Sequence, residues 1–169
     1  MANQQRNDQL RQAAHAFCQT LLTPPDPADL ISRFFAFNPR ITEHGPSWAN
    51  GRLPFLGKPF EGFDGCVEYF TLLSQTLKMH MNKATFPDIN GFIVDTSSSV
   101  SPAPESKTRA GVVCVVGKAK FESVKTGKSW QEQFIYRLSE WDEKGKFGHW
   151  EIWADPLSAW EAVGGDSES

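Results

Sequence analysis

A glutamate and a histidine stand side by side at the end of a short segment with extended character. The segment Thr42-Glu43-His44-Gly45-Pro46 places His44 directly before a turn. An imidazole with an ordinary pKa of about 6.5 can accept and return a proton near neutral pH. Two interpretations stay open, a proton shuttle in general acid–base catalysis or a structural histidine hydrogen-bonded at a loop. Because side chains alternate along an extended chain, we expect Glu43 to point the opposite way, as a solvated partner.

A second candidate pair lies in the segment 130–138. Its alternation puts Trp130, Glu132, Phe134, Tyr136 and Leu138 on one side of a strand, and this is the more apolar side. Glu132 and Tyr136 should then face the interior, roughly 7 Å apart along the strand. The phenol can donate a hydrogen bond to a substrate oxygen, and the carboxylate can act as a base. In the alternative interpretation, Glu132 lies at a rim and Tyr136 is ordinary core.

The last strand-like segment is ambiguous from its pattern alone. Alternation separates His149, Glu151 and Trp153 from Trp150, Ile152 and Ala154. The first set would supply an acid–base pair if it faced a pocket, and the second set would supply an apolar wall. A β-bulge would exchange the two faces.

The elements that must position these side chains come in a clear order. Helical periodicity is followed by strand-like alternation, which predicts an α+β fold with helices on one face of an antiparallel sheet. We expect a single domain at 8–163, flexible termini at 1–7 and 164–169, and a mobile loop at 96–108. Helices are predicted at 8–22, 27–35 and 62–77, with a short one from Asp155-Pro156, and strands at 40–44, 79–89, 91–95, 109–124, 129–141 and 147–154.

Composition excludes several functional classes. The chain has 169 residues and a net charge of −3, so it offers no basic surface for nucleic acid or an anionic membrane. No apolar run is long enough to cross a bilayer, and the polar N-terminus does not resemble a signal peptide, so we expect a cytoplasmic protein. The cysteines are few and far apart, and the four histidines show no ligand spacing with carboxylates. We therefore predict no metal and no cofactor.

The order of elements also resembles a known family. Two helices, the segment Phe35-Ala-Phe-Asn-Pro-Arg-Ile-Thr-Glu-His-Gly-Pro46, a third helix and long strands ending in Trp150-Glu-Ile-Trp-Ala-Asp-Pro-Leu157 are similar to the SnoaL-like branch of the nuclear-transport-factor-2-like superfamily. The resemblance covers about Asp8 to Val163. It implies a curved sheet wrapped around three helices, a cone with a deep apolar pocket. Such folds carry enzymes and binding domains alike.

The resemblance implies roles for particular residues. His44 lies about where steroid isomerases of the superfamily carry their proton-shuttling carboxylate. Phe17 and Phe134 replace the two oxyanion donors of those enzymes, which argues against steroid isomerisation by that mechanism. The last strand should turn Trp150 and Ile152 inward. His149, Glu151 and Trp153 would then lie on the outer face of the sheet, where relatives form homodimers.

These observations combine into one functional prediction and one alternative. Six Trp and thirteen Phe residues suit a pocket for a bulky, apolar, oxygenated molecule such as a polyketide or terpenoid. We predict a cofactor-independent isomerase, cyclase or dehydratase in which His44, Tyr136 and Glu132 are catalytic. The alternative is a non-catalytic ligand-binding or dimerisation module. The expected substrate-binding residues are Phe17, Trp48, Tyr69, Phe134, Trp150 and Ile152.

Overall fold

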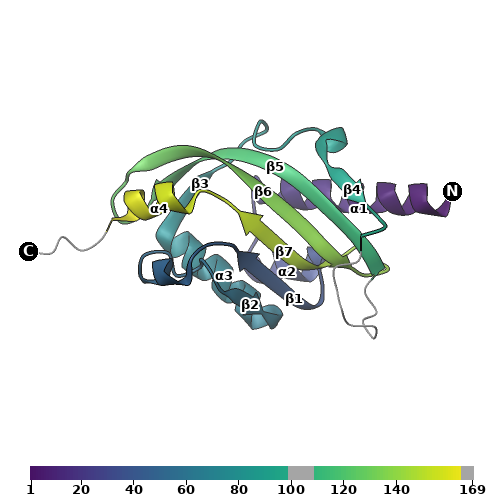
Figure 1. Cartoon of the computed structure of the whole chain (residues 1–169), viewed down its shortest axis with the longest axis horizontal. Helices are drawn as coiled ribbons and strands as arrows, with labels where there is room; N and C mark the ends of the chain where they lie inside the picture. The colour runs from purple at the N-terminus through teal and green to yellow at the C-terminus, as the bar shows by residue number, and fades with distance from the viewer. Residues whose placement is uncertain (99–108, 165–169) are drawn as a thin grey trace, which may run out of the picture.

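The computed structural model describes residues 1–98 and 109–164, and its helices and strands follow the predicted order (Figure 1). The predicted loop 96–108 and the tail 164–169 therefore lie largely outside the described residues. The helices are α1 (Ala2–Leu21), α2 (Pro27–Phe34), α3 (Gly62–Thr76) and α4 (Pro156–Val163), with short 3-10 helices η1 (Ser47–Gly51) and η2 (Ile89–Gly91). The strands are β1 (Phe35–Glu43), β2 (Pro59–Glu61), β3 (Leu77–His80), β4 (Ile93–Asp95), β5 (Arg109–Ser123), β6 (Ser129–Trp141) and β7 (Phe147–Trp153).

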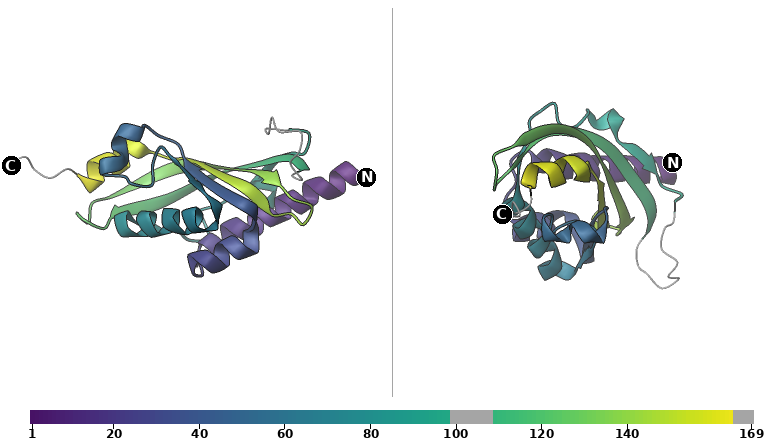
Figure 2. Two further views of the ribbon diagram at one scale, coloured as in Figure 1. Left: turned by 90° about the horizontal axis from the view of Figure 1, so that it is seen from below. Right: turned by 60° about the vertical axis from the view of Figure 1, so that its left-hand side comes forward.

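The strands form one curved, mainly antiparallel sheet. Its order is β2-β1-β7-β6-β5-β3, and β4 pairs separately with β5. Among the strands in the described part of the chain, the β1–β7 pair alone is parallel. Seen from one end, the sheet arches over α4, and the other helices lie across its open side (Figure 2). The fold class is therefore α+β, as predicted, with the helices on the concave face. Among the described residues, none of the helices is both long and apolar enough to cross a bilayer.

Two boundaries differ from the sequence prediction. The first helix begins at Ala2, although residues 1–7 carry no apolar stripe and were expected to be flexible. Tertiary hydrogen bonds hold this polar turn, because Arg6 donates to the Asp142 carbonyl oxygen at 2.9 Å and Gln9 to that of Glu143 at 3.2 Å. The predicted strand 79–89 is limited to β3, after which Asn82 and Thr85 form a turn.

The longest strand pair contains one tight contact that the sequence does not reveal. Gly117 of β5 lies opposite Phe134 of β6, and the Phe134 ring covers the glycine. Phe86 packs edge-on against the same ring, with centroids 5.9 Å apart. A Cβ atom at position 117 would overlap both rings. Glycine is required here by close packing.

We predict that Gly117→Ala lowers the free energy of unfolding by about 1–3 kcal/mol, because overpacking a filled core forces side chains to shift. Urea unfolding checks this. Gly51→Ala is the matched control, since an added Cβ atom at position 51 meets nothing within 4 Å. It should change the free energy by less than about 0.5 kcal/mol. Equal effects of the two substitutions would contradict the packing argument.

Candidate active site

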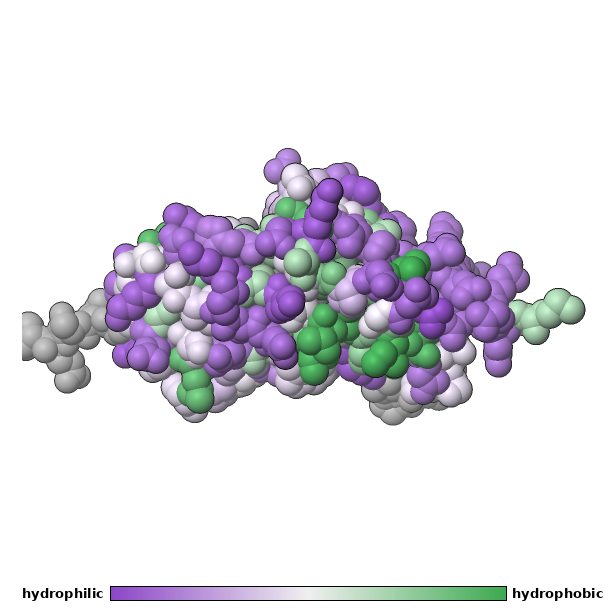
Figure 3. All heavy atoms as spheres, turned by 90° about the horizontal axis from the view of Figure 1, so that it is seen from above, coloured by the Kyte–Doolittle hydropathy of each residue, from purple (hydrophilic) through white to green (hydrophobic). Residues whose placement is uncertain are grey.

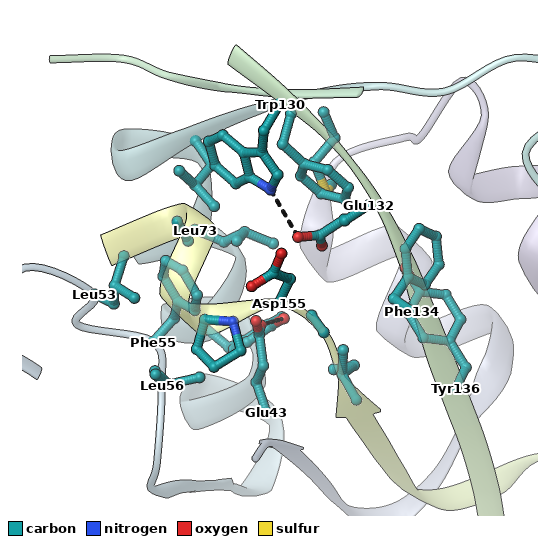
Figure 4. Close-up of a pocket in the computed structure, with 18 of the residues that line it drawn as sticks. Glu43, Leu53, Phe55, Leu56, Leu73, Trp130, Glu132, Phe134, Tyr136 and Asp155 are labelled. Atoms are coloured by element: carbon teal, nitrogen blue, oxygen red, sulfur yellow. Dashed lines mark hydrogen bonds between the residues drawn. The ribbon is translucent and has the colours of Figure 1, made fainter. Parts of the chain in front are cut away.

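A small, partly open cavity lies between the concave face of the sheet, α3 and α4 (Figure 4). Its volume is about 40 Å³, enough for a few water molecules. The predicted deep pocket is therefore wrong in size, because the aromatic rings mostly pack against one another. Tyr136 and Trp150, for example, meet edge-to-face at 5.0 Å between ring centroids. Apolar parts of the wall come from Leu53, Phe55, Leu56, Phe134, Ile152 and Ala159.

Three carboxyl groups from three different elements point toward one another in this cavity. They belong to Glu43 at the end of β1, Glu132 in β6 and Asp155 just before α4 (Figure 4). The rest of the wall is largely apolar. Carboxyl groups gathered in such surroundings cannot all ionise without a large energetic cost.

Glu43 is the most deeply buried of the three. Only 8% of its surface is exposed, and the Tyr69 hydroxyl of α3 donates a 2.7 Å hydrogen bond to its Oε2. Burial raises the pKa of Glu43 to about 7. The Tyr69 hydrogen bond opposes this rise, and the nearby Glu132 charge adds to it. Glu43 therefore exchanges its proton close to neutral pH.

Glu132 has a similar balance of forces. Its Oε2 accepts a 2.7 Å hydrogen bond from the Trp130 indole N–H, two residues earlier on the same face of β6. Burial raises the pKa of Glu132 to about 7. The hydrogen bond from Trp130 lowers it, and the charge of Asp155 raises it further.

Asp155 differs because it is also the N-cap of α4. Its Oδ1 accepts a 3.0 Å hydrogen bond from the Ser158 backbone N–H, as the sequence Asp155-Pro156 predicts. Hydrogen bonds from Ser158 lower the pKa of Asp155, so this carboxyl group stays ionised at neutral pH. The cavity thus combines one permanent negative charge with two groups that titrate near pH 7.

Two aromatic residues that line the cavity carry a polar hydrogen. Burial raises the pKa of Tyr136 well above its ordinary value, so its hydroxyl stays protonated. No hydrogen bond to a described residue occupies this hydroxyl. Trp150 is only 3% exposed, and its Nε1 has no hydrogen-bond partner among the described residues. An unpaired buried N–H is costly unless a ligand or water pairs with it.

His44 does not face the cavity, which corrects the sequence prediction. Its Nε2 lies 3.0 Å from Glu151 Oε1, and its ring stacks on Trp153 with centroids 4.2 Å apart, on the convex face of the sheet. The reason is which side chains of β1 face the interior. Ile41 and Glu43 turn toward the helices, so Thr42 and His44 turn outward. The expectation that Glu43 is solvated is wrong for the same reason.

The other predicted residues divide into two groups. Tyr69, Glu132, Phe134, Tyr136, Trp150 and Ile152 all lie in the cavity wall, as expected from the alternation of their strands or the helix that carries them. Phe17 and Trp48 do not. Phe17 is fully buried beneath Trp150, at 5.1 Å between centroids, and belongs to the core. Trp48 is 67% exposed and rests edge-on against Trp160.

Sequence reasoning missed Glu43 and Asp155 as members of the site. A signal for Glu43 was present, because Ile41 is two residues earlier and an apolar residue marks the inward phase of a half-buried strand. Asp155 was recognised as a helix cap, and only the tertiary structure shows that the same carboxyl group also borders the cavity.

A polar cluster occupies the opposite, convex face of the sheet. His149 lies between Arg40, at 3.2 Å, and the Thr42 hydroxyl, at 3.0 Å. Burial, and then the neighbouring Arg40 charge, lowers the pKa of His149 to about 4, so the imidazole is neutral. Burial favours a higher pKa for Glu151, but hydrogen bonds from His44 and Arg137 lower it below its usual range. No group of three or more His, Cys, Asp or Glu residues in 1–98 and 109–164 is arranged to hold a metal ion.

Known structures show the same architecture. An NTF2-like protein from Burkholderia xenovorans matches with a TM-score of 0.64 and 13% identity, over 94% of this chain and 98% of the other. TerC, crystallised with polyporic acid, matches with a TM-score of 0.58 and 14% identity, over 92% and 98%. A SnoaL-like polyketide cyclase homologue from Jannaschia matches with a TM-score of 0.54 and 11% identity, over 90% and 92%.

These likenesses establish the fold of the chain. It is the NTF2-like fold, shared with proteins described as SnoaL-like. No protein-family model matches the sequence, and no curated protein is similar enough to match. Because the identities are so low, the likeness concerns the fold alone, and function must be argued from the cavity.

We predict a pH dependence of stability that comes from Glu43. The unfolded carboxyl group ionises near its ordinary pKa, whereas the folded one holds its proton to about pH 7. The unfolded state therefore binds fewer protons between about pH 4.5 and 7, so stability falls as pH rises through this window and is highest below it.

Urea unfolding of the wild type and of Glu43→Gln at pH 5 and pH 8 checks this sign. From pH 5 to pH 8, the free energy of unfolding of the wild type should fall by about 3 kcal/mol relative to that of the variant. Titrating groups that do not interact with Glu43 cancel in the difference, and Glu132, which does, changes its magnitude but not its sign. A difference that is constant with pH, or one that grows in favour of the wild type at pH 8, would contradict the assigned protonation of Glu43.

Proposed function

We propose that this protein is a cofactor-independent enzyme that moves a proton on a carbon atom next to a carbonyl group, as in isomerisation, cyclisation or dehydration. One observation carries the proposal. Glu43 and Glu132 line one cavity, and both have a pKa of about 7. Groups that titrate near the working pH are efficient general acids and bases. The role that the sequence suggested for His44 therefore passes to Glu43.

The cavity supplies each part of such a reaction. Ionised Glu43 removes a proton from the carbon next to the carbonyl, and the electron pair of that C–H bond moves to form an enolate. The Tyr136 hydroxyl is an available donor for the enolate oxygen. Protonated Glu43 or Glu132 then returns a proton to a different atom. Tyr69 keeps the Glu43 carboxyl group in one orientation.

The surroundings favour an apolar, oxygenated substrate. Leucine, phenylalanine and isoleucine side chains make up half of the wall around the three carboxyl groups, and most of the other half is also apolar or aromatic. TerC, a protein of the same fold, was crystallised with polyporic acid, and another was described as a polyketide cyclase homologue. Both observations are compatible with an aromatic or polyketide-like carbonyl compound as the substrate class.

The exchange of α-hydrogens of 2-tetralone for deuterium, followed by proton NMR in D₂O, tests this proposal. The protein should accelerate exchange, and the rate should rise with pH to a plateau above about pH 7, because Glu43 must be ionised to act as the base. Glu43→Gln should reduce the rate roughly 10²–10⁴-fold. His44→Ala, its neighbour on the opposite face, is the matched control and should stay within about twofold.

Three results would contradict the proposal. They are full activity in folded Glu43→Gln, loss of activity in His44→Ala alone, and binding of 2-tetralone without any exchange. The last result supports the competing function, a non-catalytic ligand-binding module.

We also propose that the chain forms a homodimer through the convex face of the sheet. Val116, Ile135 and Trp153 lie in one row across β5, β6 and β7. They are 51%, 43% and 40% exposed, and they border the polar cluster of His149 and Glu151. Apolar (green) side chains interrupt the largely hydrophilic surface seen from above (Figure 3). A second copy of the same face would cover this row by two-fold symmetry.

Sedimentation equilibrium tests the dimer. The wild type should sediment as a dimer at micromolar concentration, and Ile135→Lys should weaken association at least tenfold, because it places two charges in the interface. Gln75→Lys on the exposed side of α3 is the control and should sediment like the wild type. A monomeric wild type, or equal behaviour of all three proteins, would refute this interface.

A further inference from the structure

The reacting cavity is too small for the substrate proposed above. Binding sites for drug-sized molecules usually measure about 300–1,000 Å³, whereas this cavity measures about 40 Å³. It can hold a carbonyl group and a few neighbouring atoms. The remainder of any larger substrate must be bound elsewhere, against a surface that connects with the cavity.

One surface of suitable size adjoins the cavity directly. We call it the β3 groove. It has a volume of about 850 Å³ and lies between the Leu22–Pro27 connection, the C-terminal half of α3, and β3. Leu73, Leu77 and Met79 line both the groove and the cavity. These three side chains are therefore the partition between the two spaces.

Met79 is the movable part of this partition. Leu73 and Leu77 are each only 6% exposed and belong to the core, whereas Met79 is 37% exposed on the edge strand β3. It pairs with Phe121, which also lines the cavity. An unbranched methionine side chain changes rotamer at low cost, so displacement of Met79 would join the two spaces.

The polar groups of the groove are already satisfied. Thr71 and Ser74 donate 3.0 Å hydrogen bonds to carbonyl oxygens of their own helix, at Val67 and Thr71. At the opposite rim, Lys78 and His80 both contact Glu122, at 3.6 and 3.1 Å. No unpaired charge is therefore offered to a ligand along these walls.

The third wall favours a small apolar molecule over a peptide. Pro24, Pro25 and Pro27 have no backbone N–H to donate. Lys78 lies on the free edge of β3, and a charged side chain at an edge discourages the addition of another strand. The chemistry of the groove thus fits an alkyl or aryl group.

We propose that the β3 groove binds the apolar remainder of the substrate while its carbonyl group enters the cavity past Met79. This inference rests on the function proposed above, because it takes the carboxyl cavity as the reacting site. It identifies the substrate class as an extended molecule, with a compact carbonyl-bearing end and an apolar chain or ring system.

A pair of ligands that differ only in length tests the groove. The dissociation constants of 2-tetralone and 6-hexyl-2-tetralone are measured by isothermal titration calorimetry, independently of any turnover. In the wild type, the hexyl compound should bind at least on the order of tenfold more tightly, because each buried methylene strengthens binding about fourfold. Ser74→Trp, which fills the groove, should abolish this advantage of the hexyl compound over 2-tetralone.

Two further variants are controls. The first separates filling of the groove from a general effect of a large ring on α3, and the second separates binding in the groove from catalysis. Gln75→Trp adds the same ring to the next residue of the helix, outside the groove, and should retain the hexyl advantage. Glu43→Gln should also retain it while exchange of 2-tetralone is lost. If exchange is absent in every protein but the hexyl advantage follows this pattern, the proposed function fails and the groove still binds an apolar ligand.

Three outcomes of the binding measurements would overturn the groove proposal. The hexyl compound gains nothing over 2-tetralone in the wild type, or Ser74→Trp keeps the gain, or Gln75→Trp loses it equally. Sedimentation of Ser74→Trp addresses a different occupant. Loss of self-association in this variant would show that a second copy of the chain fills the groove, which also overturns the proposal. Circular dichroism confirms that each variant is folded.

Discussion

The buried carboxyl group of Glu43 is the constraint on which the candidate site depends. A carboxylate removed from water is strongly destabilised, so the group either keeps its proton or needs donors close by. The Tyr69 hydroxyl is the one donor that reaches it among the described residues, at 2.7 Å, and burial outweighs this hydrogen bond. The result is a carboxyl group with a pKa of about 7, suited to exchange protons at neutral pH.

The fold sets this balance by bringing three elements to one point. The end of β1 carries Glu43, the middle of β6 carries Glu132, and the start of α4 carries Asp155. Asp155 stays ionised because it caps α4, and its charge helps to hold the proton on Glu132. The residue that caps α4 therefore also raises the pKa of Glu132 on the neighbouring strand β6. The apolar wall completes the effect, since it excludes the water that would otherwise stabilise the charges.

Much of this arrangement can be predicted from the sequence. Alternation along β6 correctly placed Glu132 and Tyr136 on the inner face, and Asp155-Pro156 correctly marked the last helix. The sequence prediction is wrong at β1, because the chemistry of the His44 imidazole does not decide which way its strand faces, whereas the apolar Ile41 indicates that Glu43 points inward. The size of the cavity could not be predicted, because it depends on how the rings of Phe134, Tyr136 and Trp150 pack together.

The most direct test of the central claim is the titration of Glu43 itself. In protein labelled with ¹³C at the glutamate side-chain carboxyl carbon, the resonance that disappears in Glu43→Gln reports this one group. Its chemical shift should change with a midpoint near pH 7, and the group should be protonated at pH 5. A midpoint at the ordinary glutamate pKa of about 4.3 would show that Glu43 is a permanent carboxylate. Such a result would contradict the proposed proton transfer.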